Sequence, residues 1–109
     1  MIDHEKNLRK AIELSKQSID SGSSPFGCVI VDAEGKIVGE GHNRVAPDND
    51  PTAHGEIVAI RNACRNLGTF DLSGCILYTS CEPCPMCLNA CKWANICLLY
   101  TSDAADEAR

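Results

Sequence analysis

The chain has 109 residues, 44% of them hydrophobic and 23% charged, and a formal net charge of −5. These residues leave room for one domain with one core and for no separate regulatory module. The composition is that of a globular protein. The Lys and Arg residues are scattered along the chain, which argues against a large nucleic-acid footprint.

Cysteine is the unusual component of the composition. No apolar run has signal-peptide or membrane-spanning length, so we expect a cytoplasmic protein that does not enter a membrane. Thiols stay reduced in the cytosol. The eight cysteines are therefore expected to be buried thiols, metal ligands or catalytic groups rather than disulfides.

Hydrophobic periodicity predicts alternating helices and strands in a single α/β unit. Asp3 is a candidate cap for the first helix, and Gly68 is a candidate C-terminal residue for the second. In chain order, we expect a helix that ends before residues 21–25, strands at 28–31 and 37–41 around a turn at 32–36, a loop at 44–53, a helix at 54–67, a strand at 75–79 and a helix at 84–95. This order implies an α/β sandwich in which the third strand reaches its neighbour across a helical connection.

The chemically informative residues fall in two stretches thirty positions apart, "TAHGE" and "TSCEPCPMC". They place His54 and Glu56 at the start of one expected helix, and Cys84 and Cys87 at the start of the next. Residues at i and i+3 share one face of a helix, so both thiols could bind the same cation. If the two helix N-termini meet, one imidazole and two thiolates leave a fourth position open, as in catalytic zinc sites.

Glu56 is the candidate base of this site. Two thiolates cancel the charge of a zinc ion, so a water bound to the metal needs a nearby group to take its proton. A simpler interpretation is that Glu56 only favours the helix dipole and that His54 is only a cap. A spacing of His-x-Glu followed by Pro-Cys-x-x-Cys is the signature of zinc nucleobase deaminases and favours the catalytic interpretation.

Other functions for the cysteines are open. Cys84 and Cys87 could form a redox pair, but a thioredoxin-like role explains neither His54 nor Glu56. A non-catalytic zinc-binding module would have no use for the carboxylate of Glu56. Cys81 is expected to be a buried small residue rather than a ligand. Four further cysteines lie on apolar faces and are expected in the core: Cys28, Cys64, Cys75 and Cys91.

With these residues in place, the chain resembles the cytidine and deoxycytidylate deaminase superfamily, and within it the bacterial guanine deaminases. The segments "PFGCVIV", "NDPTAHGEIVAIRNAC" and "LYTSCEPCPMCL" carry the resemblance, which runs from about Phe26 to Ile96. The tRNA adenosine deaminases share the Asp-Pro-Thr-Ala-His stretch, but their cysteine motif typically reads Thr-Leu-Glu-Pro-Cys. The "TSCEPC" of this chain has the guanine-deaminase-like form.

The resemblance implies a three-layer α-β-α sandwich with a mixed central sheet, and hydrolysis of guanine to xanthine and ammonia in purine metabolism. One zinc ion per chain would be held by His54, Cys84 and Cys87, with Glu56 as general acid and base. The alternatives are a tRNA adenosine deaminase, which would make tRNA a partner, or another nucleobase deaminase.

The resemblance also implies substrate contacts and a quaternary structure. Asn43 aligns with the asparagine that contacts the base, although a turn-forming role fits an Asn at a strand end. Phe26 would pack beside the base or anchor a loop, and Ala53 would line the substrate site. Trp93 fits an interface, a pocket or the core. The resemblance to guanine deaminases further implies a homodimer in which a C-terminal segment, exchanged between the subunits, closes the pocket.

The last segment differs from the rest. Residues 97–109 contain "CLLYTSDAADE", which resembles the translated read-through of a transposase mosaic-end sequencing adapter. On this interpretation residues 1–96 are an incomplete catalytic domain that ends after the third helix, and 97–109 are a non-native tail. The alternation of Ile96, Leu98 and Tyr100 leaves a native fourth strand as the alternative.

Overall fold

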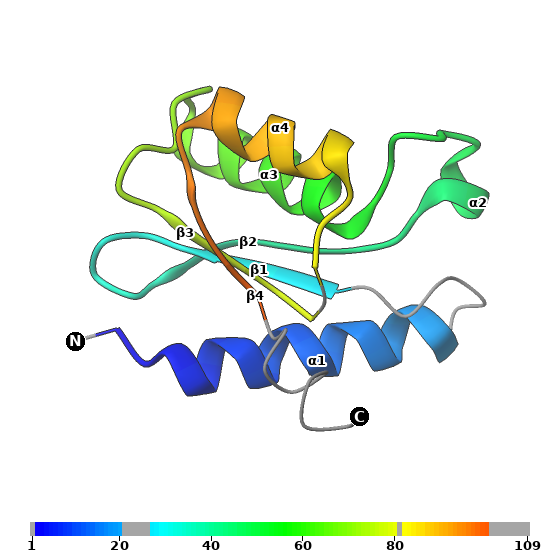
Figure 1. Ribbon diagram of the computed structural model, residues 1–109, viewed down its shortest axis with the longest axis horizontal. Helices are drawn as coiled ribbons and strands as arrows, with labels where there is room; N and C mark the ends of the chain where they lie inside the picture. Colours follow the sequence, from blue (N-terminus) through cyan, green and yellow to red (C-terminus); the bar gives the residue numbers. More distant parts are fainter. Residues whose placement is uncertain (1, 21–26, 81, 101–109) are drawn as a thin grey trace.

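The computed structural model of the protein describes residues 2–20, 27–80 and 82–100. Three layers are visible in Figure 1: α1 covers one face of a sheet, and α3 and α4 cover the other. The elements are α1 (His4–Asp20), β1 (Gly27–Val31), β2 (Ile37–His42), α2 (Val45–Asp48), α3 (Gly55–Leu67), β3 (Ile76–Thr79), α4 (Pro85–Ala94) and β4 (Cys97–Tyr100).

The central sheet is mixed, as predicted. Its strand order is β2-β1-β3-β4. β1 is antiparallel to both β2 and β3, whereas β3 and β4 are parallel. Parallel neighbours need a crossover connection, and α4 provides it between β3 and β4. The predicted α/β sandwich is therefore confirmed.

Alternation along the strands creates two apolar cores, one on each face of the sheet. Cys28 and Ile30 of β1 pack with Ala59 of α3, whereas Val29 and Val31 pack with residues of α1. Successive side chains of a strand point to opposite faces, so a strand buried on both faces reads as one apolar run. The cysteines predicted to be in the core are found there: Cys28, Cys75 and Cys91 are buried, and Cys64 packs against the cluster.

The helix boundaries follow the local signals predicted from the sequence. The Oδ1 atom of Asp3 accepts a hydrogen bond from the Lys6 backbone N–H at 3.0 Å. Gly68 follows α3 in the left-handed region, with φ of 67°. Pro85 occupies the first turn of α4, where a missing N–H costs nothing. No helix in the described ranges is both long and apolar enough to cross a membrane.

Two features go beyond the predicted elements. The loop predicted at 44–53 contains the one-turn helix α2, and the ion pair between Arg44 and Asp48 spans that turn. A fourth strand, β4, pairs with β3. This strand matches the alternative interpretation of the last segment, in which the alternation of Ile96, Leu98 and Tyr100 indicates a strand. The backbone bond from Cys97 N–H to the Cys75 carbonyl, 3.1 Å long, begins this pairing.

Candidate metal centre and active site

The N-termini of α3 and α4 meet on the same side of the sheet, and each contributes its cap residue. His54 and Cys84 both have extended backbone, with ψ of 158° and 167°, before their helices begin. Their carbonyls accept the first helical hydrogen bonds, from Val58 at 3.0 Å and from Leu88 at 2.9 Å. Neither side chain caps its own helix. The interpretation of His54 as a mere cap is therefore not supported, and its imidazole faces the other helix.

Three potential ligand atoms gather at this junction. The Nδ1 atom of His54 lies 3.6 Å from Cys84 Sγ and 3.6 Å from Cys87 Sγ. All three atoms lie within 4.8 Å of one another. In a tetrahedral site with Zn–S near 2.3 Å and Zn–N near 2.05 Å, the N···S separation is about 3.6 Å. Both N···S separations thus match those of a tetrahedral zinc site, and one imidazole and two thiols are a donor set that zinc prefers.

The cluster has a buried side and an accessible side. Cys87 is fully buried, whereas His54 and Cys84 are partly exposed. Three protein ligands are one fewer than a closed structural zinc site uses, and a catalytic site keeps the fourth position for water or substrate. The accessible side of the cluster is where such a ligand would approach.

Glu56 lies one residue into α3 and is only 4% exposed. Burial raises the pKa of the Cys87 thiol well above its ordinary value, and the charge of Glu56 raises it further. The same two causes, in the same order, raise the pKa of Cys28 and bring that of Cys91 to about 11. Glu56 is therefore a buried carboxylate surrounded by thiols.

The predicted substrate residues Asn43 and Ala53 lie on the chain that leads from β2 to His54. Asn43 is 8% exposed, and its Oδ1 accepts a hydrogen bond from the Val45 N–H at 3.0 Å, so it does form the turn that its position suggested. Ala53 is buried, and its carbonyl accepts a bond from the Arg44 N–H at 2.8 Å. Their contacts with a substrate stay predictions. Phe26 and Cys81 lie outside the described residues.

An ion pair that the sequence analysis missed braces the segment before His54. Asp50 Oδ1 accepts hydrogen bonds from the N–H and the hydroxyl of Thr52, at 2.9 and 2.6 Å. Arg61 of α3 donates to Asp50 Oδ2 at 3.1 Å. The Thr52 bonds and then Arg61 hold the pKa of Asp50 below its ordinary value. An Asp followed two residues later by Thr is a turn signal that would have identified Asp50, although not Arg61.

Comparison with known proteins bears directly on this cluster. Residues 1–102 match the family model described as the cytidine and deoxycytidylate deaminase zinc-binding region. Guanine deaminase of Bacillus subtilis strain 168 is 49% identical over 98% of this chain and 69% of its own length. Its crystal structure superposes with a TM-score of 0.87, covering 97% of this chain and 70% of that chain. The resemblance to bacterial guanine deaminases is therefore confirmed.

Two further relatives show the breadth of the family. The tRNA-specific adenosine deaminase of Aquifex aeolicus strain VF5 is 46% identical over 82% of this chain. A structure solved in complex with 2,6-diaminopurine is 30% identical, has a TM-score of 0.81 and covers 97% of this chain. The chain spans 58% of the first of these proteins and 61% of the second. The cluster of His54, Cys84 and Cys87 lies within the matched zinc-binding region, and the chain belongs to the cytidine and deoxycytidylate deaminase family.

Proposed function

We propose that the protein is a zinc-dependent guanine deaminase, a hydrolase that acts on the C–N bond of a cyclic amidine and converts guanine to xanthine and ammonia. One observation carries the proposal: the Nδ1 atom of His54 lies at zinc-site distance from the Sγ atoms of Cys84 and Cys87, and the buried carboxylate of Glu56 acts on the Cys87 thiol. The 49% identity to Bacillus subtilis guanine deaminase supports guanine as the substrate. The relative in complex with 2,6-diaminopurine supports a purine base.

The residues of this chain divide the chemistry between them. His54, Cys84 and Cys87 would hold one zinc ion, which when bound lowers the pKa of a water ligand and polarises the reacting carbon. Glu56 takes a proton from the attacking water and passes it to the ring nitrogen beside the amine-bearing carbon. A C–O bond forms, the C–N bond breaks, and the second proton leaves with ammonia. Because Glu56 is buried, few water molecules can solvate its carboxylate and compete for the proton.

The substrate contacts are proposed on the β2 side of the site. Asn43 would read the purine edge, because one lone pair of its Oδ1 and its N–H2 group can pair with a donor and an acceptor together. Its bond to the Val45 N–H supports this role by fixing the plane of the amide. Ala53 would line the same side, and Phe26 would pack against the base. The assembly proposed for the complete protein is a homodimer.

Deamination of adenosine in tRNA is the second candidate, and the 46% identity to the Aquifex aeolicus enzyme favours it. An assay with free guanine and with tRNA separates the two. We expect turnover of guanine and none of tRNA. Inosine formation in tRNA without turnover of guanine would replace the first proposal by the second.

The test of the mechanism is Glu56→Gln. The amide has nearly the shape of the carboxylate but cannot take a proton, so we expect zinc to remain bound and guanine turnover to fall by about 10²–10⁴-fold. Zinc content and xanthine formation are measured on the same sample. Turnover that persists with zinc bound would show that Glu56 is not the proton-transfer group.

Zinc content tests the metal site independently of activity. We expect about one equivalent per chain, lost in Cys84→Ala and retained in Cys64→Ala, because Cys64 packs in the core away from the cluster. Atomic emission on protein freed of loosely bound metal measures it. Folded protein without zinc would contradict the metal site itself.

We further propose that residues 1–96 are native sequence belonging to the catalytic domain and that 97–109 are a non-native tail. The likeness of "CLLYTSDAADE" to adapter read-through supports this boundary. Resequencing the gene across codon 96 tests it. A native gene that encodes this stretch would make β4 a strand of the natural protein.

A further inference from the structure

The packing of β2 against α3 contains a close backbone contact near the proposed active site. A Cβ atom on Gly41 would lie 2.5 Å from the Gly55 carbonyl oxygen and 2.5 Å from the Ala59 backbone nitrogen. Both atoms belong to the main chain, so no side chain can move aside to make room. The strand and the helix approach this closely because Gly41 has no side chain.

This contact connects the segment that carries His54 and Glu56 with the strand that leads to Asn43. Gly55 stands between His54 and Glu56, so its carbonyl moves with the metal ligand and with the proposed base. Gly41 stands two residues before Asn43, at the end of β2. The separation of Gly41 and Gly55 therefore sets the distance between the proposed catalytic residues, His54 and Glu56, and Asn43, which we propose contacts the base.

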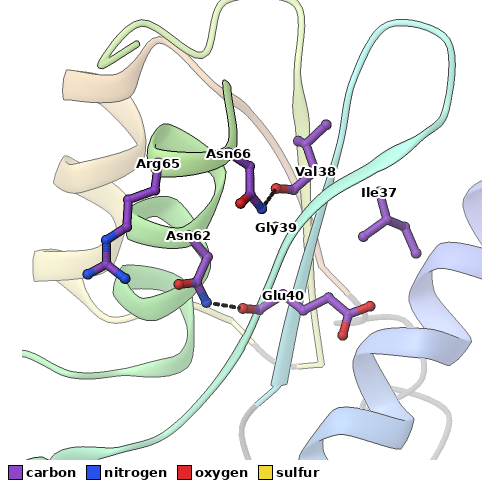
Figure 2. A pocket seen from close by; sticks show the side chains of 7 residues that line it. All are labelled: Ile37, Val38, Gly39, Glu40, Asn62, Arg65 and Asn66. Atoms are coloured by element: carbon purple, nitrogen blue, oxygen red, sulfur yellow. Dashed lines mark hydrogen bonds between the residues drawn. The ribbon is translucent and has the colours of Figure 1, made fainter. Parts of the chain in front are cut away.

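Two amide side chains of α3 form hydrogen bonds with the backbone of β2, as Figure 2 shows, and these bonds fix the position of the helix along the strand. The Nδ2 group of Asn62 donates to the Glu40 carbonyl at 2.8 Å, and that of Asn66 donates to the Val38 carbonyl at 2.8 Å. Four helical residues rise about 6 Å and two strand residues about 6.7 Å, so the two bonds match in spacing. Because β2 is an edge strand, these bonds also occupy carbonyls that no neighbouring strand pairs with.

We propose that Gly41 is a positioning residue of the proposed deaminase site, and that its contact with Gly55 holds His54 and Glu56 at the working distance from Asn43. The proposal rests on the proposed function. Its mechanism is steric: a methyl group at position 41 would displace the first turn of α3 while leaving every ligand and the base in the sequence.

The experiment compares Gly41→Ala with a matched control, Gly39→Ala. A Cβ on Gly39 would lie 2.7 Å from the Ala59 carbonyl oxygen and 2.9 Å from Ala63 Cβ, which is comparable crowding farther along α3 from the site. Both variants are expected to lose stability in urea unfolding. Co²⁺ binding to the zinc-free chain, followed by thiolate-to-cobalt absorption, reports the ligand geometry without needing turnover.

We expect Gly41→Ala to weaken Co²⁺ binding by about 10–100-fold, as when groups that orient metal ligands are removed, and to lower kcat for guanine. Gly39→Ala should keep the wild-type Co²⁺ affinity and kcat. Unchanged Co²⁺ binding in Gly41→Ala, or an equal loss in both variants, would overturn the proposal. A wild-type chain that binds Co²⁺ without deaminating guanine would refute the proposed function. In that case the Co²⁺ affinities of the two variants still test whether Gly41 positions the metal ligands.

If Gly41→Ala does not fold, a second pair of variants tests the same positioning role. Asn62→Ala removes the hydrogen bond next to Gly41, and Asn66→Ala removes the equivalent bond next to Gly39. Each removes one amide donor and adds no bulk. A larger loss of Co²⁺ affinity in Asn62→Ala than in Asn66→Ala supports the positioning role, and equal affinities overturn it.

Discussion

At the scale of single residues, the site is a buried carboxylate among thiols. Glu56 adds to the effect of burial in raising the pKa of Cys28, Cys87 and Cys91. Without a cation these groups cannot all ionise, since like charges in a medium of low dielectric constant repel strongly. Zinc would supply the positive charge that allows two of the thiols in this region to become thiolates.

This environment predicts how stability depends on pH. The pKa of Cys91 is about 11 in the folded chain, above its ordinary value of 9.0. The folded state keeps the proton that the unfolded state has already released, so the free energy of unfolding should fall as the pH rises from 9 toward 11. The slope is up to about 1.4 kcal/mol per pH unit for each such thiol.

Urea unfolding of the zinc-free, reduced protein at about pH 8, 9 and 10 measures this slope. Cys91→Ala should show a shallower dependence, because one of the thiols that titrate is gone. A free energy of unfolding that stays constant over the range would contradict the burial of these thiols in their protonated form.

At the scale of elements, the helix ends decide where the candidate metal ligands lie. α3 and α4 are each preceded by a cap residue of extended backbone, His54 and Cys84, and neither candidate ligand caps its own helix with its side chain. Each ends at a left-handed residue, Gly68 in the first case and Asn95 in the second. These local signals set the length of each helix and hence the position of its first turn.

Gly68→Ala tests the end of α3. The left-handed backbone strains any Cβ. Among the described residues, apart from Gly68 itself and its two chain neighbours, no heavy atom lies within 4 Å of where that Cβ would be, so the cost is conformational. We expect a loss of about 1 kcal/mol in urea unfolding, with zinc content unchanged. As the control, Asn95→Gly relieves a left-handed backbone with φ of 62° and loses only the exposed 3.3 Å bond from Asn95 Nδ2 to Asp71 Oδ1, so we expect it to cost less stability than Gly68→Ala. Wild-type stability in Gly68→Ala would contradict the helix end described here.

At the scale of the whole molecule, the metal would tie together two helices whose ligands lie thirty positions apart in the chain. His54 belongs to the segment before α3, and Cys84 and Cys87 to the start of α4. Because the unfolded chain has no preformed site, the free energy of zinc binding adds to the stability of the fold.

Zinc removal should therefore lower the midpoint of thermal unfolding. At a free zinc concentration of 100 Kd the expected stabilisation is about 2.7 kcal/mol, and it grows with the logarithm of the concentration. Differential scanning calorimetry with and without chelator measures it. Cys84→Ala should show no response to zinc. Equal midpoints for the zinc-loaded and zinc-free protein would contradict a site formed by folding.

The sequence by itself determined most of the helices and strands and the set of candidate metal ligands. Asp3, Gly68 and Pro85 mark helix ends through the conformational preferences of one residue, so no distant contact is needed to recognise them. The i and i+3 spacing of Cys84 and Cys87 likewise depends only on helix geometry. A strand buried on both faces, such as β1, shows as an apolar run for the same local reason.

The tertiary structure decided what packing brings together. The meeting of two helix N-termini, the parallel pairing of β4 and the 87% exposure of Trp93 depend on how α4 lies across the sheet. Residues far apart in the sequence are also brought together by the hydrogen bonds from Asn62 and Asn66 to the backbone of β2, and by the backbone contact of Gly41. Spacing along the chain does not encode such distances, because they arise only when strand and helix have closed on one another.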